Sequence, residues 1–283
     1  MRWVCFRRDG QQRMGYLVGE KVQPVRAGSL FEVMRGEGLE AVGEALPLGE
    51  VQLLPPLRPP KVVAVGNNYW DHCREQGIAP PERPVLFAKF PTSVIGPGEA
   101  IRWPKGLTQM VDFEAELAVV IGQRARGLSE AEALEAVFGY TAANDVSARD
   151  LQFGDGQWLR GKALDTFLPL GPAVVTRDEV PDPQNLSVRC WLNGNLMQDS
   201  STKEMIFPVK ALIAFISQAF TLEPGDVILT GTPHGVGYFR KPQVFLKPGD
   251  QVRVEIGDFG ALENPVGPEV EVQHGDLPKH WPR

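Results

Sequence analysis

The segment at residues 110–122, MVDFEAELAVVIG, places three carboxylates at every second position and then becomes entirely apolar. Alternate residues of a β-strand share a face, so Asp112, Glu114 and Glu116 would point to one side and the apolar residues between them to the other. The continuation LAVVIG is typical of a strand that is buried on both faces. The sequence therefore predicts a strand that carries carboxylates into the core of a β-rich protein.

The composition agrees with a β-rich fold and limits the kinds of binding partner to expect. The 283 residues include 30 Gly and 25 Pro, which indicates many turns between short elements. A net charge of −6 without a basic run argues against nucleic acid or an anionic membrane as the main partner, so we expect a small molecule. The N-terminus lacks a secretory apolar segment, and no apolar run approaches the roughly 20 residues of a membrane span. We therefore expect a cytoplasmic protein with reduced cysteines.

Two regions are predicted along the chain. Residues 1–57 read as short strands with one weak helix, a small N-terminal β-rich domain that ends in the proline-rich LLPPLRPPK. Residues 58–283 would form the larger, catalytic domain, and the N-terminal region would pack against this domain or against the dimer interface. Ser129 and Glu132 form a capping-box pattern at the start of one predicted helix. A second helix would bury one apolar face over residues 208–220, namely Val209, Leu212, Ile213, Ile216 and Phe220.

The alternating carboxylates suggest a metal site. Carboxylates that enter a core need a cation, because an unpaired buried charge costs several kcal/mol. No Lys or Arg lies between them, so a metal ion is an economical partner, although a solvated strand face would explain the same alternation. Asp145, in YTAANDVSARDLQ, is a candidate third ligand; a helix cap before Val146 is its alternative role. Oxygen ligands favour Mg²⁺ or Mn²⁺ over Zn²⁺, and Ca²⁺ is expected to be able to substitute.

His72 and Glu75 are candidates for proton chemistry. They are spaced i and i+3 on a short predicted helix that ends at Gly77, so the carboxylate could hold the imidazole in one tautomer; a surface ion pair would use the same spacing. The loop TGTPHGVG has glycines that would let backbone N–H groups approach an anion, together with the hydroxyls of Thr230 and Thr232, or it forms an ordinary tight turn.

Six motifs in order resemble the fumarylacetoacetate hydrolase family, in the bacterial branch with the 2-hydroxyhepta-2,4-diene-1,7-dioate isomerase-like enzymes. They are GNNYWDHCREQG, PVLFAKFPTSVIGPGEAI, VDFEAELAVVIG, NDVSARDLQ, GKALDTFLPLGP and ILTGTPHGVG, and they cover roughly residues 60–267. The resemblance implies an α+β, β-rich fold, a mixed β-sheet roll of the fumarylacetoacetate hydrolase type, and a homodimer.

The resemblance also implies roles for individual residues. Glu114, Glu116 and Asp145 match the family's metal ligands, whereas Asp112 belongs to the motif without being a ligand. His72 and Glu75 match a catalytic pair on a mobile segment that closes over the substrate. Positions used near metal or substrate in the family correspond here to Lys162, Gln152 and Thr232, and also to Tyr69 and Arg149. Asn67 stands where some members have Arg.

The predicted activity is that of a divalent-metal-dependent enzyme that acts on 2-oxo acids through a metal-bound enolate. C–C bond hydrolysis of an acylpyruvate-type substrate, with water activated by His72 and Glu75, is the first expectation. The alternative is an isomerase, tautomerase or decarboxylase of the 2-hydroxyhepta-2,4-diene-1,7-dioate or oxaloacetate type, in which His72 and Glu75, or Lys162, would carry the proton. A remote alternative is a non-catalytic binding protein that a metal stabilises.

Overall fold

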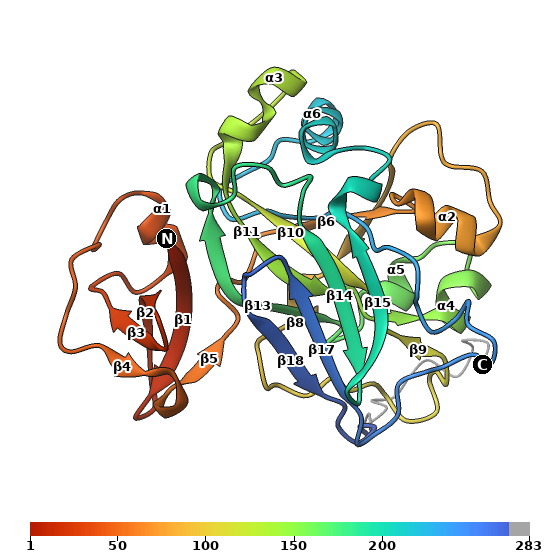
Figure 1. Ribbon diagram of the computed structural model, residues 1–283, viewed down its shortest axis with the longest axis horizontal. Helices are drawn as coiled ribbons and strands as arrows, with labels where there is room; N and C mark the ends of the chain where they lie inside the picture. Colours follow the sequence, from red (N-terminus) through yellow and green to blue (C-terminus); the bar gives the residue numbers. More distant parts are fainter. Residues whose placement is uncertain (272–283) are drawn as a thin grey trace, which may run out of the picture.

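The computed structural model describes residues 1–271, and most of its strands belong to one mixed sheet of 12 strands (Figure 1). In spatial order these are β4 (Leu46–Pro47), β3 (Lys21–Pro24), β2 (Gln11–Val18), β1 (Arg2–Arg8), β13 (Leu168–Thr176), β11 (Val137–Asn144), β10 (Ala115–Ile121), β16 (Val227–Leu229), β6 (Val62–Gly66) and β7 (Val85–Lys89). In addition, β5 (Gln52–Leu54) pairs with β1 and β8 (Val94–Ile95) with β13. The pairs β16–β6 and β13–β8 are parallel, and the others are antiparallel.

Two smaller sheets, six α-helices and five short 3₁₀ helices complete the described chain. A four-stranded antiparallel sheet packs against β10 and β11, and its order is β15 (Asn195–Ser201), β14 (Ser187–Leu192), β17 (Gln251–Ile256), β18 (Ala261–Pro265). A two-stranded sheet pairs β9 (Val111–Asp112) with β12 (Ser147–Ala148). The helices are α1 (Leu30–Met34), α2 (Trp70–Gln76), α3 (Glu130–Ala133), α4 (Arg149–Gly154), α5 (Leu159–Lys162) and α6 (Val209–Ala219). The predicted β-rich mixed roll is thus confirmed, and no helix within residues 1–271 has the length and apolarity to cross a membrane.

Strand β10 is the centre of the core, as the apolar run LAVVIG predicts. Every residue of β10 is buried. Leu117 and Val119 face the larger apolar cluster beneath the four-stranded sheet, whereas Ala118 and Val120 face a second cluster on the other side. Because apolar groups cover both faces, the segment after the carboxylates is fixed in the middle of the molecule.

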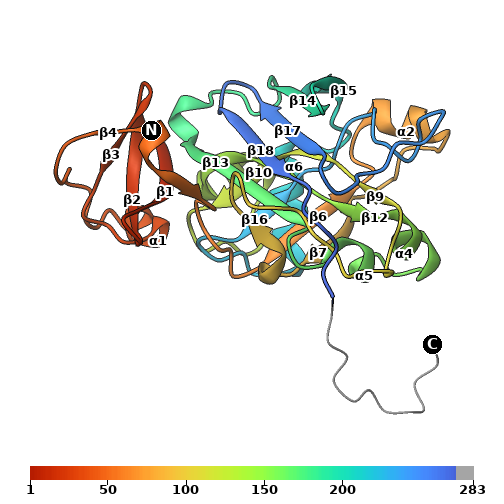
Figure 2. The same cartoon turned by 90° about the horizontal axis from the view of Figure 1, so that it is seen from below.

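The N-terminal strands extend the large sheet. Strand β1 pairs with β13, with Arg2 opposite Val175 and Trp3 opposite Val174. Figures 1 and 2 show β1 to β4 and α1 gathered at one end of the molecule, beside the rest of the chain. The expectation that this region packs against the larger part of the chain is met by strand pairing.

The two predicted helices exist but are bounded differently. Glu132 accepts a hydrogen bond from the backbone N–H of Ser129 at 3.0 Å, as in a capping box, yet α3 ends at Ala133 and a 3₁₀ turn leads into β11. Helix α6 buries the predicted face except at Phe220, which is 48% exposed. That prediction was wrong because α6 ends at Ala219 and Phe220 has extended backbone angles, so its side chain leaves the helical face.

Candidate metal centre and active site

The strand that carries the alternating carboxylates is interrupted between β9 and β10. At the break, the backbone N–H of Glu114 donates to Asn144 Oδ1 and that of Ala115 donates to Gln198 Oε1, both at 2.9 Å. Side chains therefore replace the ladder hydrogen bonds at this point, which keeps the backbone polar groups satisfied inside the core.

Glu114, Glu116 and Asp145 come together as the sequence predicts. One carboxylate oxygen from each lies within 4.8 Å of the others, and all three side chains are buried. The pairing of β10 with β11 explains this proximity, because Asp145 directly follows β11 and its N–H donates to the Glu114 carbonyl at 2.9 Å. The alternative role for Asp145 is wrong: Val146 leads into β12, and the next helix, α4, begins only at Arg149.

Three buried cations from other elements surround these carboxylates. Lys162 Nζ donates to Glu114 Oε2 at 2.7 Å and to Asp145 Oδ2 at 2.8 Å. Lys89 Nζ donates to Asp145 Oδ1 at 2.5 Å and to the Lys162 carbonyl. Arg149 bridges Glu114 Oε1 at 2.6 Å and Asp112 Oδ2 at 2.9 Å. The absence of Lys and Arg within the strand is thus compensated by residues that the fold brings in from elsewhere.

Glu116 is the carboxylate that these cations leave uncompensated. Among residues 1–271 it forms no ion pair, and its one hydrogen bond comes from the N–H of Gly231 to Oε2 at 2.8 Å. Burial, together with Asp145 and Glu114, raises the pKa of Glu116 well above its usual value. For Glu114 burial acts in the same direction, but Lys162 and Arg149 outweigh it and lower the pKa to about 2. Counting Asp112, the cluster contains one more carboxylate than buried cations, and Glu116 is the carboxylate without an ion-pair partner in the described chain. A bound cation would compensate it, and the oxygen donors of Glu114, Glu116 and Asp145 suit a hard divalent ion.

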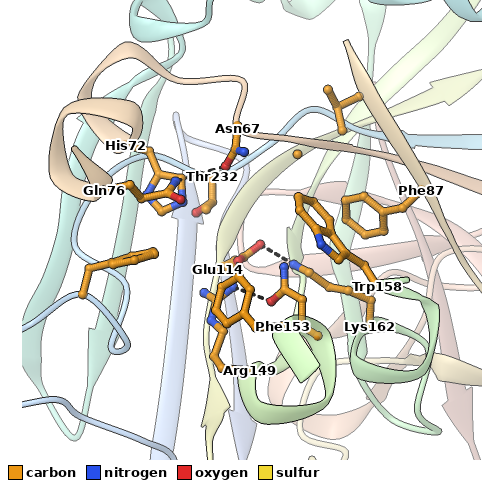
Figure 3. Close-up of a pocket in the computed structure, with 14 residues that line it drawn as sticks. Asn67, His72, Gln76, Phe87, Glu114, Arg149, Phe153, Trp158, Lys162 and Thr232 are labelled. Atoms are coloured by element: carbon orange, nitrogen blue, oxygen red, sulfur yellow. Dashed lines mark hydrogen bonds and ion pairs between the residues drawn. The ribbon is translucent and has the colours of Figure 1, made fainter. Parts of the chain in front are cut away.

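A cavity opens beside this cluster (Figure 3). Charged and polar residues form part of its wall, and aromatic residues form the rest. The lining residues are Val65, Gly66, Asn67, His72, Gln76, Phe87, Glu114, Arg149, Gln152, Phe153, Trp158, Lys162, Thr232 and Phe239. Of the three candidate metal ligands, Glu114 is the one that reaches the cavity wall.

His72 and Glu75 form the predicted pair, and His72 lines the cavity. His72 Nδ1 lies 2.9 Å from Glu75 Oε2, and the imidazole is buried although it lines the cavity. Glu75 Oε1 accepts from the N–H of Gly235 at 2.8 Å, so both carboxylate oxygens are engaged. Because Nδ1 faces Glu75, Nε2 is the ring nitrogen that can exchange a proton with a bound molecule.

The predicted substrate-binding residues divide into two groups. Arg149, Gln152 and Thr232 line the cavity; Gln152 Oε1 accepts from Arg149 Nη1 at 3.0 Å, and Arg149 Nη2 is buried without a partner in the described chain. Tyr69 and Thr230 do not line it. The Thr230 hydroxyl donates to the Leu117 carbonyl at 2.8 Å and Tyr69 is fully buried, and their assignment to substrate contact stays a prediction.

Backbone N–H groups of the glycine-rich loop TGTPHGVG donate hydrogen bonds to carboxylates of the protein itself. Gly231 donates to Glu116 and Gly235 to Glu75, each at 2.8 Å. Further along, Gly237 donates to Asp112 Oδ1 at 2.7 Å and Tyr238 to Asp112 Oδ2 at 2.9 Å. The expected anion-binding loop therefore exists, but the anions are side chains of the site, and the loop joins the carboxylate strand to α2.

Sequence reasoning missed Lys89 and the aromatic part of the wall. Lys89 carries a signal that could have been used, since it is a single charge at the end of the apolar strand VLFAK. Trp158 carried none: its ring lies against Gly66, where an added Cβ would come within 2.3 Å of the indole, and it meets Phe87 edge to face at 5.4 Å. These contacts depend on how distant segments pack.

Comparisons with known proteins identify the family. The fumarylacetoacetate (FAA) hydrolase C-terminal family matches residues 61–267, and the Rv2993c-like N-terminal family matches residues 1–56. The mitochondrial oxaloacetate tautomerase fahd2 of Xenopus laevis is 52% identical over 231 residues, which are 81% of this chain and 72% of that protein.

Two solved structures share the fold over nearly the whole chain. Fumarylacetoacetate hydrolase (EaFAH) from the psychrophilic Exiguobacterium antarcticum has a TM-score of 0.86 at 43% identity, covering 94% of this chain and 99% of that one. The 2-hydroxyhepta-2,4-diene-1,7-dioate isomerase from Mycobacterium marinum has a TM-score of 0.81 at 38% identity, covering 94% and 98%. The chain belongs to the fumarylacetoacetate hydrolase family.

Proposed function

We propose that this chain is a divalent-metal-dependent tautomerase that interconverts the keto and enol forms of a 2-oxo acid, with oxaloacetate as the expected substrate. The observation that carries the proposal is the 52% identity to the Xenopus laevis oxaloacetate tautomerase over 81% of this chain. The similarity to an isomerase of a hydroxy-diene dioate supports the same class of reaction. Proton transfer, the alternative in the sequence analysis, is therefore better supported than the hydrolysis that was expected first.

Keto–enol exchange is chemically the smallest of the predicted reactions. One proton leaves the carbon next to the keto group, one proton arrives on the keto oxygen, and neither a C–C bond nor a water molecule is consumed. A site for this reaction needs one group that accepts and returns a proton. His72 is suited to it, because Glu75 holds Nδ1 and leaves Nε2 available at the cavity wall.

Arg149 and Gln152 are proposed to hold the substrate's carboxylate. Arg149 Nη2 is a buried donor without a partner in the described chain, and a bound carboxylate would supply the missing acceptor. Lys162 is proposed as a fixed positive charge, since its Nζ already donates to two carboxylates, which opposes its release as a base. We therefore assign the proton transfer to His72.

The metal proposal rests on the buried carboxylates. Glu114, Glu116 and Asp145 would hold Mg²⁺ or Mn²⁺, and Ca²⁺ is expected to be able to replace it. When bound, such an ion would withdraw electron density from the keto group and make the neighbouring C–H more acidic. We also propose that the protein forms a homodimer and does not bind nucleic acid.

The test follows the enol form of oxaloacetate by its ultraviolet absorbance in the presence of Mg²⁺ or Mn²⁺. We expect the purified protein to accelerate conversion to the keto form, with no more pyruvate than the metal alone produces. The His72→Asn variant should lose about a hundredfold or more of this rate. It should still be stabilised by the metal against heat, which controls for folding.

Acylpyruvates and the hydroxyhepta-diene dioate serve as competing substrates in the same assay. Rapid acylpyruvate cleavage together with background oxaloacetate tautomerisation would replace the proposal with hydrolysis. Preferential isomerisation of the diene dioate would keep the reaction class and change the substrate.

A further inference from the structure

Helix α2, which carries His72 and Glu75, is attached to the rest of the molecule by a second carboxylate. Asp71 Oδ2 accepts from Ser200 Oγ at 2.5 Å and lies 2.9 Å from His234 Nδ1. Asp71 Oδ1 accepts from the backbone N–H of His234 at 3.4 Å. Ser200 belongs to β15 and His234 to the glycine-rich loop, so one carboxylate joins three elements.

Neither Asp71 nor His234 lines the cavity. The Asp71 side chain is 11% exposed, whereas the His234 imidazole is 48% exposed on the outer side of the loop. A carboxylate that is nearly buried needs donors, and Asp71 receives them from two neighbours. The exposed imidazole can donate through Nδ1 in either its neutral or its protonated form.

The attachment matters because α2 cannot hold its own position. It has 7 residues, about two turns, and a helix of this length is not stable in water without tertiary contacts. Asp71 directly precedes His72 on the helix, so whatever fixes Asp71 also limits the direction of the imidazole. The bond from Gly235 to Glu75 fixes the following turn to the same loop. The helix is thus tied to residues 234–235 at both of its turns.

We propose that Asp71 and His234 are positioning residues that hold α2 against the glycine-rich loop and thereby keep His72 directed into the cavity. The consequence for turnover rests on the proposed function; the attachment of α2 does not. If His234 is removed, α2 should open more often, and the fraction of molecules with a correctly placed His72 should fall.

Two variants of His234 separate positioning from simple structural loss. His234→Ala removes the donor, whereas His234→Asn retains a side-chain N–H close to the position of Nδ1. We expect His234→Ala to lower kcat for the 2-oxo acid by about fivefold to tenfold, with KM changed by less than about twofold. Hydrogen exchange of the backbone amides of residues 70–76 should accelerate by a similar factor. His234→Asn should stay within about twofold of the wild type in both measurements.

The exchange experiment needs no turnover, so it stays informative if the substrate assignment fails. Faster exchange at residues 70–76 in His234→Ala and not in His234→Asn would support the attachment even in a protein inactive on oxaloacetate. Wild-type exchange in His234→Ala, or equal acceleration in both variants, would overturn it. Asp71→Asn combined with His234→Ala gives the second check: effects that simply add would show that the two residues do not act as a pair.

Discussion

The N-terminal end of the large sheet and its central strands bury different kinds of side chain. In residues 1–57 no buried side chain carries a charge, and Val4, Phe6 and Val22 pack with Ala173 of β13 in an apolar cluster. Around the ends of β10 and β11, strands of this sheet together with α2, β9, α4 and α5 bury a group of ionisable side chains: His72, Lys89, Asp112, Glu114, Glu116, Asp145, Arg149 and Lys162. Apolar burial stabilises the N-terminal end directly, whereas the charged region around β10 and β11 must recover its desolvation cost through ion pairing.

This difference separates residues that stabilise the fold from residues that are kept for chemistry. Apolar residues of similar volume are often at least as stabilising as a buried ion pair, so stability alone does not account for so many charges in one place. Ionisable groups with shifted pKa values that converge on a cavity are typical of a reactive site. Within residues 1–57 Cys5 is the one buried ionisable side chain and no charged side chain is buried beside it, which favours the region around β10 and β11 as the place of the chemistry.

The largest expected effect is the loss of the uncompensated carboxylate at the site. Glu116→Gln keeps an acceptor for the Gly231 N–H but removes the charge, and we expect kcat/KM to fall on the order of a thousandfold because metal assistance is worth several kcal/mol. Calorimetric titration with Mn²⁺ should show binding to the wild type and none to the variant. Without metal the variant should be as stable as the wild type, since the fold already favours the neutral form of Glu116.

Glu50→Gln is the matched control in the N-terminal region. Glu50 pairs with Arg8 on the surface, so its loss should leave both activity and metal binding unchanged. Full metal-dependent activity in Glu116→Gln would show that Glu116 is not needed to bind the metal.

The next effect compares a buried with an exposed ion pair. Lys162→Met leaves Glu114 and Asp145 without their shared ammonium, and in excess chelator we expect a loss of about 3–5 kcal/mol in the free energy of unfolding. Arg8→Met breaks the exposed pair with Glu50 and should cost less than about 1 kcal/mol. Urea unfolding of both variants measures the difference; equal losses would show that the buried network carries no special electrostatic weight.

Local features of the site could be predicted from the sequence. The alternation of Glu114 and Glu116, the spacing of His72 and Glu75, and the place of Asp145 at the end of a strand all involve neighbours within one or two elements. The family motifs added their order along the chain. The β-rich class followed in the same way, from the doubly apolar run of β10 and the many turn residues.

Distant pairings could not be predicted. Lys89 meets Asp145 across 56 residues, Lys162 meets Glu114 across 48, and Arg149 meets Asp112 across 37. Local periodicity does not predict these contacts, because each depends on how elements far apart in the sequence pack together. The inference that the carboxylates lacked cations failed for this reason, and Glu116 alone retains the feature from which it was drawn.

The smallest expected effect concerns Cys5, the one buried side chain of residues 1–57 that can ionise within the usual pH range. Burial, only partly offset by Arg7, raises the pKa of its thiol from 9.0 to about 11. Above pH 9 the unfolded chain loses this proton while the folded chain keeps it, so the stabilisation is complete below pH 9 and is lost as the pH rises to 11. Urea unfolding at pH 8 and pH 11 should show about 1–2 kcal/mol more loss in the wild type than in Cys5→Ser. Enzymatic activity at pH 8 should be the same in both proteins, because Cys5 lies outside the cavity. An identical pH dependence in the two proteins would mean that water reaches the Cys5 thiol. The contrast between the apolar N-terminal end and the charged region around β10 and β11 would then weaken.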